Sequence, residues 1–128
     1  MQIEVPTVTA ADLIMPPAAE GSEAVRARVI AARELQSQRY AAHESKGVRT
    51  NADCGGTLLE DIAAPDRAGM ALLREAADTL KLSARGYHRT LRVARTMADL
   101  DGADEVARVH IAEALSYRGE TLKLQIAA

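Results

Sequence analysis

Hydrophobic residues recur at intervals of three and four along most of the chain, and polar residues fill the positions between them. This spacing places the apolar side chains on one face of an α-helix. The pattern predicts helices over about 23–43, 57–63, 67–80, 84–100 and 105–117. Each of these segments has a residue at its start whose side chain can cap a helix: Ser22, Thr57 (with Glu60 completing a capping box), Asp66, Ser83 and Asp104.

The first 21 residues do not follow this pattern. Residues 2–6 alternate between apolar and polar and stop at Pro6, as at the end of a β-strand, although one strand cannot form a sheet alone. Residues 7–21, which include Pro16 and Pro17, are expected to form an extended connector. We therefore expect an extended arm over 1–21, a helical domain over 22–118 and a flexible tail over 119–128. The weak alternation in the tail is compatible with a frayed helix, an edge strand or disorder.

The composition favours an all-α fold. Only 2% of the residues are aromatic, with three Tyr and no Phe or Trp, whereas the chain has 26 Ala. Such a core consists of aliphatic side chains and closely packed Ala, which suits helices better than a β-sandwich. The scarcity of aromatic residues also argues against base-stacking sheets such as those of OB folds. The 128 residues are enough for one domain, and we expect a bundle of about five helices.

Charge and cysteine content exclude several kinds of site. Lys and Arg number 16 against 18 Asp and Glu, so the net charge of −2 does not draw the whole protein to nucleic acid or a membrane surface. Cys54 is the only cysteine, which excludes an internal disulfide and favours a cytoplasmic protein. The three His are far apart and lack the spacing of metal ligands, so no metal site is expected. No apolar run approaches the roughly 20 residues that span a bilayer.

The predicted helix 84–100 concentrates positive charge on one face. At about 100° per residue its polar positions fill one arc, which holds Arg85, His88, Arg89, Arg92, Arg95, Thr96 and Asp99. No acid lies between Asp78 and Asp99, so arginines three and four residues apart repel one another. Four arginines on one face therefore need an external anion or acids from the helices over 22–43 or 66–80.

Arg85 differs from the other arginines because it lies in the first turn of this helix, two residues after Ser83. The helix dipole is positive there and backbone N–H groups are free, so a cation is misplaced unless an anion is near. For Arg85, a phosphate contact and a solvated, ion-paired surface are both open. For Arg89, Arg92 and Arg95, ion pairs within the domain are the simpler interpretation. A nucleic-acid or partner face that includes Arg92 and Arg95 is the alternative.

Four stretches of the chain are distinctive in their order and spacing. The longest is Leu82-Ser83-Ala84-Arg85-Gly86-Tyr87-His88-Arg89-Thr90-Leu91-Arg92-Val93-Ala94-Arg95-Thr96-Met97-Ala98-Asp99-Leu100. The others are Glu4-Val5-Pro6, Val25-Arg26-Ala27-Arg28-Val29 with Ala32-Arg33 and Gln36, and His110-Ile111-Ala112-Glu113-Ala114-Leu115-Ser116-Tyr117-Arg118. Over about residues 2–118 the chain resembles the C-terminal region of magnesium-chelatase-like AAA+ ATPases of the ComM/YifB competence-protein type. The three shorter stretches resemble, in turn, the segment after that family's DRID-type arginine-finger motif, its first lid helix and its final lid helix.

The resemblance implies that the chain is the helical lid of a larger ATPase and not a whole enzyme. Neither a GxxxxGK[ST] phosphate loop nor an acidic Walker B strand is found in the sequence, and in the family both lie upstream. Residues 2–6 would be the last strand of the upstream core domain. ATP and Mg²⁺ would belong to the parent protein, and the chain alone would be no enzyme and would bind no cofactor tightly.

The resemblance also implies roles for residues and partners. Arg85 matches the family's sensor-2 arginine, which reaches the γ-phosphate of ATP across a subunit boundary of a hexamer and stabilises the transferring phosphoryl group. Arg89 and His88, on the same face, are candidates for further phosphate contacts. The expected partners are the upstream core domain, neighbouring subunits and, through the parent protein, DNA, since ComM-type proteins drive branch migration during natural transformation. The alternative is a stand-alone helical DNA-binding or protein-interaction module that uses the Arg85–Arg95 face.

Overall fold

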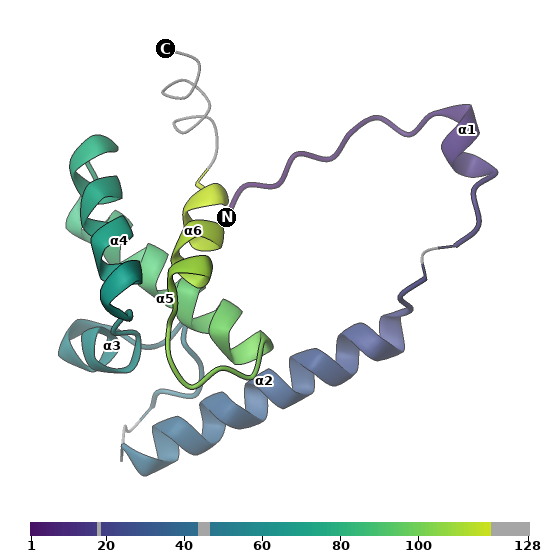
Figure 1. The fold of residues 1–128 in the computed structure, drawn as a ribbon. Coiled ribbons are helices and arrows are strands. Elements are labelled where there is room, and N and C mark those ends of the chain that lie inside the picture. The colour runs from purple at the N-terminus through teal and green to yellow at the C-terminus, as the bar shows by residue number, and fades with distance from the viewer. Residues whose placement is uncertain (18, 44–46, 119–128) are drawn as a thin grey trace.

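A computed structural model describes residues 1–17, 19–43 and 47–118 of the chain. These residues form six helices and no strand: α1 (Ala10–Leu13), α2 (Ser22–Ala42), α3 (Gly56–Ile62), α4 (Arg67–Thr79), α5 (Ala84–Leu100) and α6 (Arg108–Ser116). In Figure 1, α3 to α6 gather in one group, α2 lies along the side of that group, and the arm that carries α1 extends away from it. The predicted all-α fold is confirmed, with five helices in the domain and a short sixth in the arm.

Helix α5 is the centre of the domain. It contacts α2, α3 and α6, and α4 packs against α6. The buried apolar residues of these helices recur at helical spacing and include Leu73 and Ala76 on α4, Leu91, Ala94 and Ala98 on α5, and Ile111, Ala114 and Leu115 on α6. Burying one Leu or Ile side chain stabilises the fold by about 1.5–3 kcal/mol. The many alanines let the helices approach closely, which explains how a core without Phe or Trp can be filled.

Two of the five predicted helix caps are confirmed. Asp66 accepts a hydrogen bond from the Gly69 N–H at 2.6 Å at the start of α4, and Ser83 accepts one from the Gly86 N–H at 3.1 Å at the start of α5. Both side-chain oxygens satisfy a backbone donor that has no partner within its own helix.

The other three predicted caps are wrong. Gly21 and Gly55 are the N-cap residues of α2 and α3, so Ser22 and Thr57 lie inside their helices and make no capping bond. Asp104 does not cap α6, which begins only at Arg108. The reason is tertiary: Val106 is fully buried and pairs with Pro65, and its carbonyl accepts the Asp66 N–H at 2.9 Å. A segment bonded in this way to another part of the chain cannot also start a helix.

The arm differs from its prediction in two places. Residues 2–6 form no strand; the Gln2 N–H instead donates to the carbonyl of Tyr117 at 2.9 Å, next to the end of α6. Within the expected connector, residues Ala10–Leu13 form α1, because Thr9 and Asp12 make a complete capping box. The hydrogen bond from the Thr9 side chain lowers the pKa of Asp12. The predicted flexible tail, 119–128, lies outside the described residues.

Candidate functional site

The first turn of α5 presents a positive surface to solvent. Arg85 is exposed there, and Arg89 is exposed one turn further along the helix. Neither guanidinium pairs with a carboxylate among the described residues, and the first turn of α5 holds no acid. Arg85 thus lies at the positive end of the helix dipole, with Arg89 one turn away and no counter-charge for either in the described part of the chain, an arrangement that attracts an anion.

A cleft of about 470 Å³ opens beside this turn. Arg85 and Arg89 line one side, Arg118 extends into it from the end of α6, and Met1 and Gln2 of the arm complete the wall. The guanidinium groups of Arg85 and Arg89 on α5 therefore line this cleft together with that of Arg118, which lies in the turn after α6. Guanidinium groups bind phosphate oxygens through paired N–H donors, so the cleft suits a phosphate group.

His88 and Arg92 lie along the same face of α5, beside Arg85 and Arg89 around a second hollow of about 500 Å³. The His88 ring contacts Glu60 on α3, with 3.1 Å between Nε2 and Oε1. Arg92 donates from Nε to the carbonyl oxygen of Cys54 at 2.7 Å. We call Arg85, His88, Arg89 and Arg92 the arginine surface of α5. Arg85 and Arg89 of this surface are exposed to solvent. Arg92 is partly buried and, through its bond to the Cys54 carbonyl, fixes the loop before α3.

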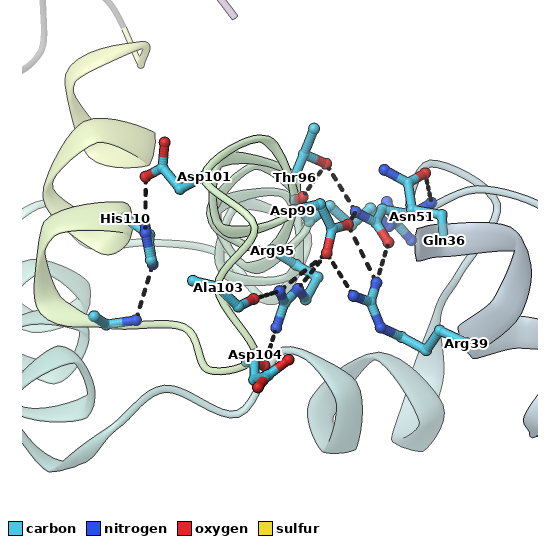
Figure 2. Close-up of polar contacts among 12 residues, drawn as sticks. Gln36, Arg39, Asn51, Arg95, Thr96, Asp99, Asp101, Ala103, Asp104 and His110 are labelled. Carbon is cyan, nitrogen blue, oxygen red and sulfur yellow. Dashed lines mark hydrogen bonds and ion pairs between the residues drawn. The ribbon is translucent and has the colours of Figure 1, made fainter. Parts of the chain in front are cut away.

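The assignment of Arg95 to an exposed nucleic-acid or partner face is wrong. Only 2% of its surface is accessible, and its guanidinium points into the domain (Figure 2). Nε and Nη2 contact Oδ1 of Asp99 at 3.0 and 2.9 Å, while Nη1 and Nη2 donate to the carbonyls of Asp104 and Ala103 at 2.8 and 2.6 Å. Arg95 therefore holds the loop that follows α5 and is too deeply buried to contact an external partner.

Asp99 is the centre of a buried polar cluster that sequence reasoning missed. Its carboxylate, which is fully buried, accepts from Arg95 and also from Arg39 of α2, with 3.1 Å between Nη1 and Oδ2. The amide of Asn51 donates to the same carboxylate at 2.8 Å and to the Thr96 hydroxyl at 3.0 Å. Figure 2 shows these side chains converging from α2, from α5 and from the loop between α2 and α3.

Hydrogen bonds complete the cluster on its α2 side. The Tyr40 hydroxyl donates to Oδ1 of Asn51 at 2.8 Å, and the Asn51 N–H donates to Gln36 at 3.2 Å. Among the described residues, no buried side-chain nitrogen or oxygen lacks a partner. Such full satisfaction is what makes a buried network tolerable, because an unpaired polar group in a low-dielectric interior is costly.

The pKa shifts of the cluster follow from burial and contact. The hydrogen bond that Arg39 donates to Asp99 raises the pKa of Arg39, whereas burial lowers the pKa of Arg95 despite the attraction of Asp99. Burial also raises the pKa of Tyr40 far above its ordinary value of 10.0, so its phenol stays protonated at alkaline pH values at which an exposed tyrosine would ionise. Two cations therefore share one carboxylate, and Arg95 satisfies its remaining donors on backbone carbonyls.

One sequence signal pointed to part of this cluster. Arg95 and Asp99 are four residues apart on the same helix, a spacing at which opposite charges pair. Arg39 and Asn51 gave no such signal, because each reaches Asp99 only through the packing of α2 and the following loop on α5. A helical projection places all polar residues of α5 on one arc, but it does not tell which part of that arc another element covers.

A family model matches the same residues that form the helical domain. The family described as magnesium chelatase, subunit ChlI C-terminal, matches residues 19–118, which span α2 to α6. The chain therefore belongs to this family, and the helical domain is a C-terminal lid domain of the magnesium-chelatase type.

Comparison with curated proteins supports the ComM/YifB resemblance. The chain is 46% identical over 99 residues to an uncharacterised protein of Mycobacterium tuberculosis, a match that covers 77% of this chain and 19% of that protein. It is 36% identical over 106 residues to competence protein ComM of Haemophilus influenzae. That match covers 83% of this chain and 19% of ComM. It is also 36% identical over 99 residues to the uncharacterised protein YifB of Salmonella typhimurium. That match covers 77% of this chain and 18% of YifB. The chain thus spans about a fifth of the length of these relatives.

Within the described part of the chain, no three His, Cys, Asp or Glu side chains lie close enough together to hold a metal ion. No helix of that part combines the length and the apolar character needed to cross a bilayer.

Proposed function

We propose that this domain supplies a sensor-2 arginine, Arg85, to ATP bound by the ATPase of which it is the lid. The observation that carries the proposal is the exposed, unpaired guanidinium of Arg85 in the first turn of α5, beside an open cleft. A γ-phosphate in that cleft would provide the missing counter-charge. As phosphoryl transfer proceeds, charge on the phosphate oxygens is redistributed, and a preorganised cation there stabilises the transition state.

Arg89 lines the same cleft and is proposed as a second phosphate contact. His88 is a weaker candidate, because its ring contacts the carboxylate of Glu60. ATP and Mg²⁺ would be bound mainly by the parent protein's core domain, and the neighbouring subunits of a hexamer would meet at this cleft. The name of the relative ComM, a competence protein, supports a parent protein that acts on DNA during transformation.

The test uses the full-length parent protein with Arg85→Ala, compared with Arg67→Ala. Arg67 is also exposed in the first turn of a helix, α4, but lies on a different surface, which makes it a matched control. We expect Arg85→Ala to lower kcat for ATP by about a hundredfold or more, as for the loss of one transition-state donor. Arg67→Ala should leave kcat within twofold. Equal turnover in the two variants would refute the sensor-2 role.

The alternative, a stand-alone DNA-binding module, has a separate test. It predicts salt-dependent DNA binding by the 128-residue chain, weakened by Arg89→Ala or Arg92→Ala. Because Arg95 is buried, Arg95→Ala should act on stability and not on binding at native conditions. Absence of DNA binding at low salt would leave the lid function as the better account.

A further inference from the structure

The turn that follows α6 makes an unexplained contact with the first turn of α5. Arg118 donates from Nη1 to the carbonyl oxygen of Gly86 at 3.1 Å, across 32 positions of the sequence. The same carbonyl accepts from the buried Thr90 hydroxyl at 3.0 Å. Gly86 directly follows Arg85, so the backbone that carries the proposed sensor arginine is fixed from two sides.

We propose that Arg118 is a positioning residue for Arg85, acting through its contact with Gly86. This inference rests on the sensor function proposed above and deepens it. Arg118 is not assigned a step in the reaction. Its guanidinium fixes where the first turn of α5 lies relative to α6, and thereby the direction from which Arg85 enters the cleft.

The glycine at position 86 supports this proposal independently. A Cβ built there would lie 3.0 Å from Nη1 and 3.3 Å from Nη2 of Arg118. Both terminal nitrogens of the guanidinium thus lie over the Gly86 backbone, in a tighter contact than most Cβ atoms make. Glycine weakens a helix relative to Ala. A glycine at position 86 therefore indicates that the room left by the missing side chain is occupied by the Arg118 guanidinium.

The surroundings of Arg118 extend the contact to the arm. The carbonyl of the preceding residue, Tyr117, accepts the Gln2 N–H at 2.9 Å. The arm, the end of α6 and the first turn of α5 therefore meet at one cleft wall. A displacement of the arm relative to the domain would act on Arg118 and, through Gly86, on Arg85.

The experiment is a double-mutant cycle in the full-length parent protein with Arg118→Gln, Arg85→Ala and the double variant. Arg108→Gln is the control, since Arg108 is an exposed arginine at the start of α6, at the end of that helix opposite to Arg118. We expect Arg118→Gln to lower kcat by on the order of tenfold, with KM for ATP within twofold, as for a misplaced catalytic group. In the Arg85→Ala background, Arg118→Gln should have no further effect, because the group that it positions is gone.

Gly86→Ala perturbs the same contact from the other side, because it adds a methyl group to α5 whereas Arg118→Gln removes the guanidinium. The added methyl group pushes the Arg118 guanidinium back by a few tenths of an ångström while favouring the helix, so we expect a smaller loss of kcat in the same direction without a loss of thermal stability. The effects of Gly86→Ala and Arg118→Gln should not add. Hydrogen exchange of a peptide covering residues 84–91 should be faster in Arg118→Gln than in the wild type and unchanged in Arg108→Gln.

The outcomes separate the two proposals. The positioning role is overturned if Arg118→Gln leaves both kcat and exchange unchanged, or if it lowers kcat equally with and without Arg85. If Arg85→Ala retains full turnover while Arg118→Gln still speeds exchange over 84–91, the sensor function fails but the contact between α6 and α5 stands. Additive losses for Gly86→Ala and Arg118→Gln would also contradict a shared route through Gly86.

Discussion

Arg39 on α2 and Asp99 on α5 form an ion pair across the interface between these two helices. Asp99 is fully buried and Arg39 keeps only 19% of its side chain exposed. The N-terminal half of α2 contains no buried residue, so this pair and its neighbours are a main attachment of α2 to the domain. Asp99 therefore joins two helices while also neutralising Arg95 within its own helix.

The first prediction concerns this carboxylate. Asp99→Asn keeps the shape of the side chain but leaves the buried Arg95 without a counter-charge. We expect a loss of about 3–5 kcal/mol in the free energy of unfolding, as for removal of one partner of a buried pair. Urea unfolding of the 128-residue chain measures it. Asp78→Asn, at an exposed position on α4, should change stability by less than about 0.5 kcal/mol, and equal losses in both variants would contradict this account.

The second prediction concerns Tyr40 at high pH. Burial raises the pKa of its phenol, so the folded state retains a proton that the unfolded state loses above about pH 10. Stability from this group is complete below that pH and falls as pH rises above it. Tyr40→Phe should cost about 1 kcal/mol at neutral pH, through the lost bond to Asn51, and should flatten the alkaline decline. Unfolding free energies measured from pH 7 to 11 test both, and an unchanged alkaline slope would contradict the burial argument.

The third prediction compares two serines at helix starts. Ser83 caps α5, whereas Ser22 lies inside α2 and makes no capping bond. Ser83→Ala should therefore lower the free energy of unfolding by about 1 kcal/mol. Ser22→Ala, the matched control, should be neutral or slightly stabilising because Ala is the better helix former. Thermal unfolding of both variants distinguishes the roles, and a larger loss for Ser22→Ala would contradict the assigned caps.

The fourth prediction concerns Gly69 in α4. A Cβ there would lie 3.0 Å from the Pro65 Cβ and 3.3 Å from the Arg108 backbone nitrogen. Gly69→Ala should therefore destabilise the domain by about 1–3 kcal/mol through overpacking, although Ala normally favours a helix. Gly21 has no neighbouring atom within 4 Å, so Gly21→Ala should cause no overpacking and should cost at most about 1 kcal/mol, because Ala is a poorer N-cap residue than Gly. Chemical denaturation measures the difference, and a stabilised Gly69→Ala variant would show that α4 and α6 are less closely packed.

Residues that act through their own helix were predictable. The helical periodicity, the caps at Asp66 and Ser83, and the exposure of Arg85 and Arg89 all follow from contacts within a few positions of the chain. The caps at Thr57 and Asp104 failed because the chain before α3 and α6 is shaped by distant partners. A good capping residue specifies a possible start, and tertiary contacts select the actual one.

The sequence by itself determined the fold class, the order of the five domain helices, the family and the positive first turn of α5. The fold class, the helix order and the positive turn followed because periodicity, capping and charge spacing are local properties, whereas the family came from the resemblance of four stretches to that family's motifs. Only the tertiary structure decided that Arg95 turns inward to Asp99, that Arg39 reaches the same carboxylate, and that Arg118 lies over Gly86. The physical reason is that the partners come from separate helices and loops. Whether a charge faces water or the interior is determined by what packs over it.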